Sequence, residues 1–425
     1  MKIIVIITVS VKRGCLPQLT GELIDHGCDI QKIVRTESSS DSDVFELEIV
    51  YSDEERYKLA IGAIGAPKGP FQVLGIKNVL EDSITGGLLR LSGKLPIENE
   101  NDYEMRVLGS ASMIVERISR GEWKRFSGIT RNVGLVSALK KKADLSPEAI
   151  HTNYTALERE SITLQYFSGY NGLPLLVQYR QIEDLIKCIQ SIDGTYSAVH
   201  FHHIEDVDDI TPYEQLISDM AVTVTGSAYD TVPLCLVTEL LQLFDKYKMD
   251  FSDSNIGIIG INISSLRITR LLLSLGCLRV LGYDNNEKLM LTLEKAGGMA
   301  TTPENIFDNT DVILLFKNHY TVDEFHKIRS GQIIISLIEE EEFERNIIKD
   351  KGIRAYLPKS SINASIFLPG LVRGMLGCEL QTINDAQLLE LAGKLKTLKG
   401  RKASALSFFS DIHDRIAQFI GEQNP

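Results

Sequence analysis

The chain has 425 residues, a net charge of −12 at pH 7 and a hydrophobic content of 44%. This length predicts about two to four domains with sizeable cores. The acidic balance, without a long basic stretch, argues against nucleic acid and anionic membranes as partners, and no apolar run reaches the roughly 18 residues of a membrane span. The six cysteines are scattered without metal-like spacing, which favours reduced thiols in a cytoplasmic protein.

Residues 1–85 alternate short apolar strands with helices. The N-terminal run MKIIVIITVS lacks the small-residue cleavage site of a signal peptide, so we expect a buried first strand. The order of elements is β-α-β-β-α-β, the ferredoxin-like split unit. Gly14 falls at the first strand-helix turn and Gly27 just past that helix, where a positive φ is commonly needed.

The turn VKRGCLPQL resembles the N-R-P-G-x-L turn of ACT domains, although Arg13 stands where the family has proline. The resemblance implies an ACT-like regulatory domain at residues 1–85. Its ligand, such as an amino acid, would bind at Gly14, Cys15 and Leu16, at an interface between two paired modules. A ferredoxin-like dimerisation module without a ligand is the alternative.

The segment from 145 to 209 predicts an α/β layer. Helices over about Tyr154–Phe167 and Ile182–Ile192 alternate with the apolar strands LPLLVQY and SAVHFHHI. The second strand ends in the densest group of metal-ligand side chains in the chain, which suits either zinc or the polar end of a strand facing a cleft. The group consists of His200, His202, His203, Glu205, Asp206, Asp208 and Asp209.

Residues 255–286 have the layout of a Rossmann-type dinucleotide-binding unit. A buried strand over Ile256–Ile259, a helix over Leu266–Leu275 and a strand over Arg279–Gly282 follow one another. The glycine fingerprint is degenerate, because only Gly260 remains, and Asn262 and Ser265 occupy the positions of the second and third glycines. Asp284 is the candidate ribose-binding acid. DVILLF and QIIISLI predict further buried parallel strands, and residues 386–423 predict helices.

Several segments, in order, are similar to motifs of the malic enzymes, particularly the bacterial forms with an N-terminal ACT module. They are LRLSGKLP, ADLSPEA, ALERESITLQYFSGYNGLPLLVQ, SIDGTYSAVHFHHIED and SINASIFLPGLVRGML. The resemblance implies a malic-enzyme-type substrate domain at 86–230, a Rossmann-type NAD(P)-binding domain with C-terminal helices at 231–425, and a homodimer or higher oligomer. Lys94 and Arg373 are retained family positions, and we expect Arg373 to make a structural ion pair.

Malic enzymes oxidise and decarboxylate malate with NAD(P) and a divalent metal, and the resemblance places their site residues here. The metal-binding acid pair falls on His202 and His203, and the third metal ligand falls near Gly226. The lysine base falls on Glu160 and the tyrosine acid on Arg106. Arginine stays protonated at any useful pH and cannot donate a proton in catalysis. We therefore expect no catalytic residues of the family type and no divalent metal.

Two functions follow as hypotheses. The first is a malic-enzyme-like protein that has lost decarboxylating activity and acts as a metabolite-sensing or partner-binding protein. The alternative is an NAD-dependent malic enzyme or a related oxidoreductase with an altered substrate. Glu160 and Glu339 would repel malate by roughly 4 kcal/mol per charge pair at about 4 Å. NAD binding is doubtful, and Asp284 would favour NAD over NADP.

Overall fold

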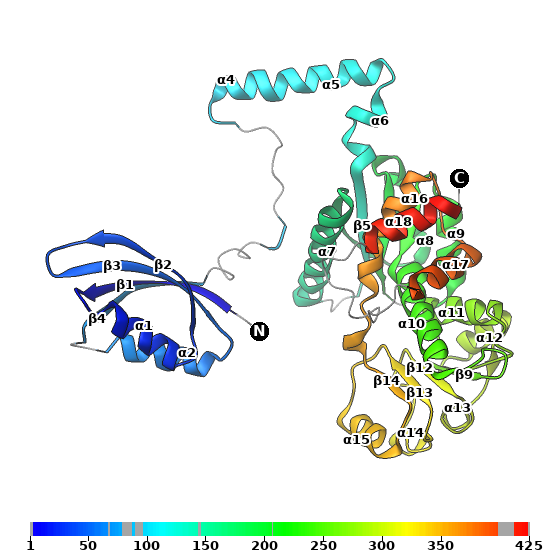
Figure 1. Cartoon of the computed structure of the whole chain (residues 1–425). Coiled ribbons are helices and arrows are strands. Elements are labelled where there is room, and N and C mark those ends of the chain that lie inside the picture. Colours follow the sequence, from blue (N-terminus) through cyan, green and yellow to red (C-terminus); the bar gives the residue numbers. More distant parts are fainter. Residues whose placement is uncertain are drawn as a thin grey trace. The chain divides into compact units, whose positions relative to one another are not determined.

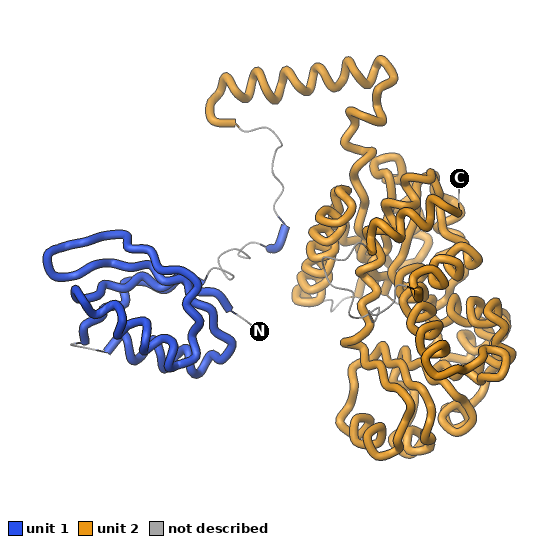
Figure 2. The backbone as a smooth tube through the Cα atoms, viewed as in Figure 1, with its two compact units in different colours: residues 1–90 blue, residues 91–425 orange. Residues whose placement is uncertain are grey.

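The computed structural model describes residues 3–66, 69–78, 87–89, 97–142, 146–205, 207–397 and 412–423. Lys94 and Asp206, which the sequence singles out, lie outside these residues. The chain divides into two compact units, Met1–Arg90 and Leu91–Pro425 (Figure 2). Within the described ranges, no helix is both long and apolar enough to cross a membrane.

The first unit confirms the predicted β-α-β-β-α-β order. Its sheet has the antiparallel order β2-β3-β1-β4, and α1 and α2 lie against one face (Figure 1). Alternate residues of β1, from Val5 to Val11, are buried, as expected for a sheet covered on one side. The elements are β1 (Ile3–Lys12), α1 (Leu16–Asp25), β2 (Asp29–Ser38), β3 (Ser42–Tyr51), α2 (Glu54–Ile64) and β4 (Phe71–Asn78).

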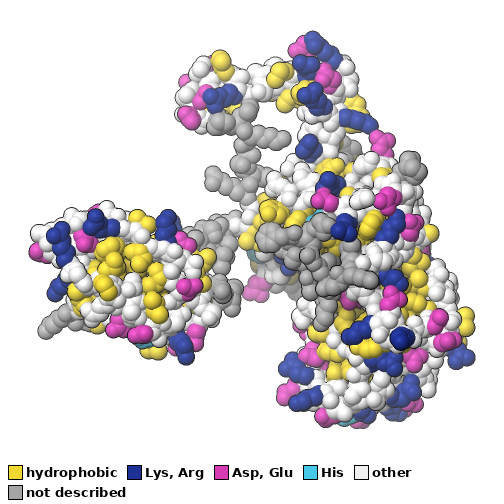
Figure 3. Space-filling model, viewed as in Figure 1, with side chains coloured by type: hydrophobic (Ala, Val, Ile, Leu, Met, Phe, Trp, Pro, Cys, Tyr) yellow, Lys and Arg dark blue, Asp and Glu magenta, His cyan; other side chains and the backbone are white. Residues whose placement is uncertain are grey.

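Apolar side chains also lie on the surface of this unit (Figure 3). Large apolar residues of its strands are at least 38% exposed, and they are Ile4, Ile33, Val34, Leu74 and Ile76. Exposed apolar surface of this kind is typical of interaction sites. Both interpretations of residues 1–85 involve a paired module, which would cover such surface.

The second unit begins with helices that have no buried residue. The consecutive helical segments α4 (Glu100–Asp102), η1 (Tyr103–Leu108) and α5 (Gly109–Ser119) expose every apolar side chain at least in part. The short helix α6 (Trp123–Phe126) follows, and Lys124 pairs with Glu379 at 2.9 Å.

A four-stranded parallel sheet of order β6-β5-β7-β8 forms the predicted α/β layer. The helix α7 starts earlier than predicted, because Ser146 caps it and Pro147 takes the first turn. Figure 1 shows α7 beside β5. The elements are β5 (Asn132–Lys140), α7 (Pro147–Ser168), β6 (Asn171–Tyr179), α8 (Ile182–Ile192), β7 (Ala198–Ile204), α9 (Ile210–Ser218) and β8 (Thr223–Gly226).

The long helix α10 (Val232–Tyr247) leads into a six-stranded parallel sheet of order β11-β10-β9-β12-β13-β14. Since this is the strand order 3-2-1-4-5-6, the predicted Rossmann-type unit is confirmed. Its elements are β9 (Asn255–Ile259), α11 (Ile263–Ser274), β10 (Arg279–Tyr283), α12 (Glu287–Lys295), β11 (Met299–Ala300), α13 (Pro303–Asn309), β12 (Val312–Leu315), α14 (Val322–Phe325), β13 (Ile333–Ser336), α15 (Glu342–Lys351) and β14 (Ala355–Leu357).

Within the described residues, C-terminal helices close the second unit, and the helices predicted at 386–423 are confirmed by the last two of them. They are α16 (Leu368–Gly377), α17 (Asp385–Lys396) and α18 (Ile412–Gln423). Gly370 and Gly374 let α18 approach α16 closely, because a Cβ at these positions would lie 2.7 and 2.8 Å from Ile416 and Ile420. Arg373, on the same helix, pairs with Asp414, which confirms the expected structural ion pair.

A buried arginine ties these helices to the sheet layer. Arg267 of α11 is fully buried and donates to Asp230 Oδ1 at 2.5 Å and to Asp385 Oδ1 at 3.0 Å. Its guanidinium also donates to the carbonyl oxygens of Tyr229 and Ile383, both at 2.7 Å. The backbone that follows β8 is therefore held from two sides, and this backbone forms part of the site described next.

Candidate functional site

A pocket of 760 Å³ opens where β7 ends, and we call it the cleft pocket. Its walls come from α7, from the end of β7, from the turn that follows β8 with the start of α10, from Glu339 and from the segment that leads into α16. The carboxyl ends of parallel strands are where α/β proteins usually bind ligands. The residues that line it include Arg159, Glu160, Phe167, His202, Ser227, Val232, Glu339, Lys359, Asn363 and Leu368.

A buried carboxylate-imidazole pair forms one wall of the cleft pocket. Glu160 Oε1 lies 2.8 Å from His202 Nδ1, and the two side chains are 3% and 20% exposed. The ladder between β5 and β7 shifts register at His202, and such bulges redirect side chains beside active sites. Two positions that the resemblance assigned to different functions thus form one pair, with the acid on the helix and the base on the strand.

Glu160 is ionised in this pair. Burial raises the pKa of its carboxyl, but the close contact with His202 and the neighbouring His200 outweigh burial and lower the pKa overall. Nδ1 of His202 lies 2.8 Å from the carboxylate but does not meet the geometry of a hydrogen bond, so the pair is a close ionic contact. A hydrogen assigned to Nδ1, on the side of the carboxylate, leaves Nε2 as the unprotonated nitrogen. The second oxygen of Glu160, Oε2, is buried without a hydrogen-bond partner among the described residues.

His200 lies next to the Glu160–His202 pair, with Nε2 3.8 Å from Glu160 Oε2. It is fully buried, with Nδ1 2.8 Å from Thr225 Oγ1 and Nε2 3.0 Å from Ser227 Oγ. Burial lowers the pKa of His200 to about 4, so the ring is neutral at pH 7. His200 and His202 share a face of β7, as predicted. Across the described parts of the chain, no cluster of three or more His, Cys, Asp or Glu residues is arranged to hold a metal.

The position expected for the third metal ligand is closed by a tyrosine. A Cβ on Gly226 would lie 2.0 Å from Tyr213 Oη, so the phenol occupies the space that a ligand side chain needs. His203, the other assigned position, is exposed at the end of β7. Divalent metals of the magnesium type require several oxygen ligands. The donor set of two histidines and a glycine does not fit such a metal.

Two expectations about charge need correction. Glu339 lines the cleft pocket, but its side chain is 86% exposed and pairs with Lys359 at 2.7 Å. Its negative charge is therefore offset, and the repulsion of an anionic substrate is weaker than expected. Arg106 lies on the exposed helical segment η1, 3.2 Å from Asp102, and does not line the cleft pocket.

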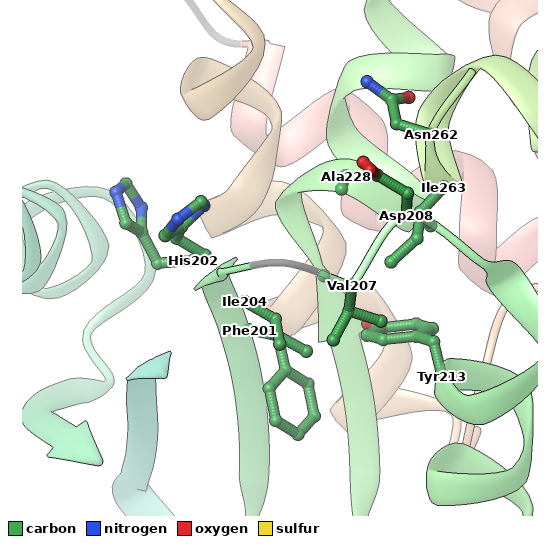
Figure 4. A pocket seen from close by; sticks show the side chains of 11 residues that line it. Phe201, His202, Ile204, Val207, Asp208, Tyr213, Ala228, Asn262 and Ile263 are labelled. Atoms are coloured by element: carbon green, nitrogen blue, oxygen red, sulfur yellow. The ribbon is translucent and has the colours of Figure 1, made fainter. Parts of the chain in front are cut away.

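A second cavity, of 150 Å³, lies where α11 begins (Figure 4). Its lining includes His202, Asp208, Tyr213 and Asn262. Tyr213 Oη is buried without a partner among the described residues, and burial raises the pKa of this phenol. Tyr213 could not be singled out from the sequence, because an isolated tyrosine in a helix is more often a core residue.

The dinucleotide turn keeps part of its expected geometry. Gly260 has a φ of 90°, which makes the tight turn. Asn262 and Ser265 cap each other at the start of α11, where their side chains accept from each other's amides at 3.0 and 2.8 Å. This capping box occupies two amides, while those of Ile263 and Ser264 have no side-chain cap. The helix N-terminus therefore still fits a phosphate in part.

Asp284 lies at the predicted place, at the end of β10, but is only 4% exposed. Its carboxylate accepts from the amides of Ile261 at 2.8 Å and Asn286 at 2.9 Å. The ammonium group of Lys317 lies 3.4 Å from the carboxylate of Asp284 and 2.9 Å from that of Asp208. A ribose that binds here would therefore compete with the hydrogen bonds that the carboxylate already accepts from the neighbouring backbone amides. Sequence reasoning missed Lys317, which follows an apolar strand without any motif.

The candidate regulatory turn lies in the first unit. Gly14 has a φ of 84° and Gly27 a φ of 79°, so the predicted positive φ is confirmed at both. Cys15 is the N-cap of α1 without a side-chain hydrogen bond, and Leu16 begins the helix. No atom lies within 4 Å of a Cβ built on Gly14, so a side chain there would strain the backbone without a clash.

The comparisons with known proteins agree with this architecture. No family model matches the chain. The NAD-dependent malic enzyme 1 of Bacillus subtilis is 19% identical over 370 residues, covering 86% of this chain and 84% of the relative. The NAD-dependent malic enzyme of Geobacillus stearothermophilus is 20% identical over 395 residues, covering 86% and 81%.

The solved structures show the same fold. The malic enzyme of Pyrococcus horikoshii matches with a TM-score of 0.65 at 16% identity, over 80% of this chain and 87% of its own. The malic enzyme of Entamoeba histolytica matches with a TM-score of 0.67 at 13% identity, over 81% and 80%. The chain has the malic-enzyme fold, with the cleft pocket at the ends of its parallel strands.

The buried histidines predict that the chain loses stability in weak acid. The pKa of His200 and that of His413 are lowered by burial from 6.5 to about 4. Between these pH values the unfolded chain binds more protons than the folded chain, so the free energy of unfolding falls as pH falls. We expect a loss of roughly 2–3 kcal/mol for each histidine by pH 4.

Thermal unfolding between pH 7 and pH 4 measures this loss. His200→Gln should flatten the pH dependence, whereas His151→Gln, an exposed change on α7, should leave it unchanged. A wild-type melting temperature that is constant from pH 7 to pH 4.5 would contradict the prediction.

Proposed function

We propose that this chain is an NAD-dependent oxidoreductase of the malic enzyme type with an altered substrate, in which His202 takes the proton. The observation that carries the proposal is the Glu160–His202 pair, at 2.8 Å, in the cleft pocket of a malic-enzyme fold. The relatives that match over more than four-fifths of their length are NAD-dependent malic enzymes, which supports the same reaction class.

In this proposal the pair acts as a general base. Ionised Glu160 lies 2.8 Å from Nδ1 of His202, and with the hydrogen on Nδ1 the atom that would accept a proton from a substrate in the cleft pocket is Nε2. A carboxylate that orients an imidazole also stabilises the imidazolium that forms. His200 stays neutral beside it, so His202 has no cationic neighbour on that side.

The cofactor fits in part and the metal does not. NAD, when bound, would accept a hydride from the substrate carbon. The tight turn at Gly260 and the first amides of α11 would hold its phosphates, and Asp284 favours NAD over NADP. The divalent metal of malic enzymes has no place in this proposal, because His202, His203 and Gly226 do not supply its oxygen ligands.

Steady-state assays with a panel of hydroxy and amino acids and NAD, followed by NADH absorbance, test the proposal. His202→Gln should lower kcat by roughly 10²–10⁴ for any substrate found, as for loss of a positioned base. The matched control is His151→Gln, which lies on α7 outside the cleft pocket. Wild-type rates in His202→Gln, or no NAD reduction with any member of the panel, would overturn the proposal.

One observation favours a second candidate, a metabolite-binding protein without catalytic activity. The capping box of Asn262 and Ser265 satisfies amides that a pyrophosphate would otherwise contact. In that case the turn at Gly14, Cys15 and Leu16 is the candidate ligand site. Gly14→Val should then abolish a thermal shift produced by an amino acid, and calorimetry should detect no NAD binding.

A further inference from the structure

The cleft pocket contains an ionised acid with an unfilled hydrogen-bonding position. Glu160 Oε1 is held by His202, but Oε2 is buried and has no partner among the described residues. His200 Nε2 lies 3.8 Å from Oε2, too far for a hydrogen bond, and is in contact with Ser227 Oγ at 3.0 Å instead. A buried carboxylate oxygen without a donor is costly, since burial removes its water. A ligand that brings a donor to Oε2 removes this cost.

A cation next to the acid supplies the other half of a binding site. Arg159 also lines the cleft pocket and is exposed, and its guanidinium makes no ion pair or hydrogen bond within the described residues, although its charge helps to lower the pKa of Glu160. By contrast, the pocket's other charged pair, Glu339 and Lys359, is already joined at 2.7 Å. Apart from Glu339 and Lys359, the formally charged side chains that line the pocket are therefore Glu160 and Arg159, consecutive residues of α7.

The rest of the wall is mixed, because hydroxyl and amide side chains such as Thr163, Ser227 and Asn363 line it together with apolar ones. Phe167, Val232, Ile362, Ile366 and Leu368 line the pocket beside these charges. A ligand that matches all three features carries a protonated amine, a carboxylate and an apolar side chain. A hydroxy acid would match the carboxylate and the side chain, but it lacks the cation that offsets the charge of Glu160.

We infer that the cleft pocket binds an amino acid with an apolar side chain, its ammonium group on Glu160 Oε2 and its carboxylate on Arg159. The inference rests on the proposed function for its chemistry. Nε2 of His202 would take one proton from the ammonium group, and a hydride would pass from Cα to NAD, which leaves an iminium ion. Water would add to the iminium carbon and release an oxo acid and ammonium, while the proton stays on His202.

Calorimetry without NAD separates binding from catalysis. The probes are leucine, its hydroxy analogue leucic acid, and isocaproate, which has neither group. Leucine should bind at least about tenfold more tightly than leucic acid, since a hydrogen bond to a charged group contributes roughly 1.5–3 kcal/mol. Equal affinity for leucine and leucic acid, or no binding of leucine, would overturn the inference.

Variants assign the two ends of the ligand. Glu160→Gln keeps the shape and should remove the preference for leucine, whereas Glu339→Gln, in the same pocket but already paired, should retain it. Arg159→Gln should weaken leucine and isocaproate alike, and Lys187→Gln on α8 is the matched surface control. A preference for leucine that survives Glu160→Gln in folded protein contradicts the assignment.

The outcomes also separate this inference from the proposed function. Leucine binding that depends on Glu160, without NAD reduction, would keep the ligand assignment and reject the oxidoreductase. NAD reduction with a hydroxy acid, without leucine binding, would keep the oxidoreductase and reject the ligand assignment.

Discussion

Malate should not be oxidised and decarboxylated by this chain when Mg²⁺ or Mn²⁺ is supplied with NAD. Glu160 stands at the position of the base, Arg106 lies outside the cleft pocket, and the assigned metal positions are His202, His203 and Gly226. Loss of one positioned proton-transfer group costs roughly 10²–10⁴ in rate, and here the acid and the metal are lost together.

The measurement is NADH formation from malate, with a malic enzyme as the positive control. Added Mg²⁺, Mn²⁺ or EDTA should make no difference to the rate in this chain. Turnover near one per second that EDTA abolishes would show that the metal site has been misassigned.

Replacing Arg267 by methionine should destabilise the second unit by about 3–5 kcal/mol, because removal of one partner leaves a buried charge unpaired. Asp230, its partner, is 2% exposed, and burial raises the pKa of its carboxyl despite the arginine. Asp230 also accepts from the amide of Gly226 at 2.7 Å, so the damage should reach the backbone beside the cleft pocket.

Urea unfolding measures the effect, with Arg270→Met as the control. Arg270 is one turn further along α11, pairs with Glu214 and Asp385, and is 30% exposed. Partly exposed pairs of this kind contribute about 0–1 kcal/mol. The double variant Arg267→Met with Asp230→Asn should lose less than the sum of the single changes. A loss below about 1 kcal/mol for Arg267→Met would refute the prediction.

The sequence predicted the fold well because the fold depends on periodic patterns. The apolar N-terminal run predicted a buried first strand, and the strand-turn-helix pattern around Gly260 predicted the Rossmann-type unit. Such patterns are local in the chain, and packing of the apolar faces then fixes the topology.

The candidate site could be predicted only in part. The resemblance brought Glu160 and His202 into one cleft, and their contact at 2.8 Å agrees with that placement. It could not show that Lys359 offsets Glu339, or that Tyr213 fills the space beside Gly226. Residues 339 and 359 are 20 positions apart in the chain, and residues 213 and 226 are 13 apart. Tertiary structure brings each pair together, so no local pattern of the sequence predicts these contacts.

The contact between Gly226 and Tyr213 also limits how the chain can change. An aspartate introduced at position 226 would place its Cβ 2.0 Å from the tyrosine oxygen, so that single step would damage the fold before it created a ligand. Shortening Tyr213 first would open a void against Phe201 and Tyr229, whose rings it contacts. A carboxylate at position 226 therefore requires two substitutions, and each of them alone would destabilise the protein.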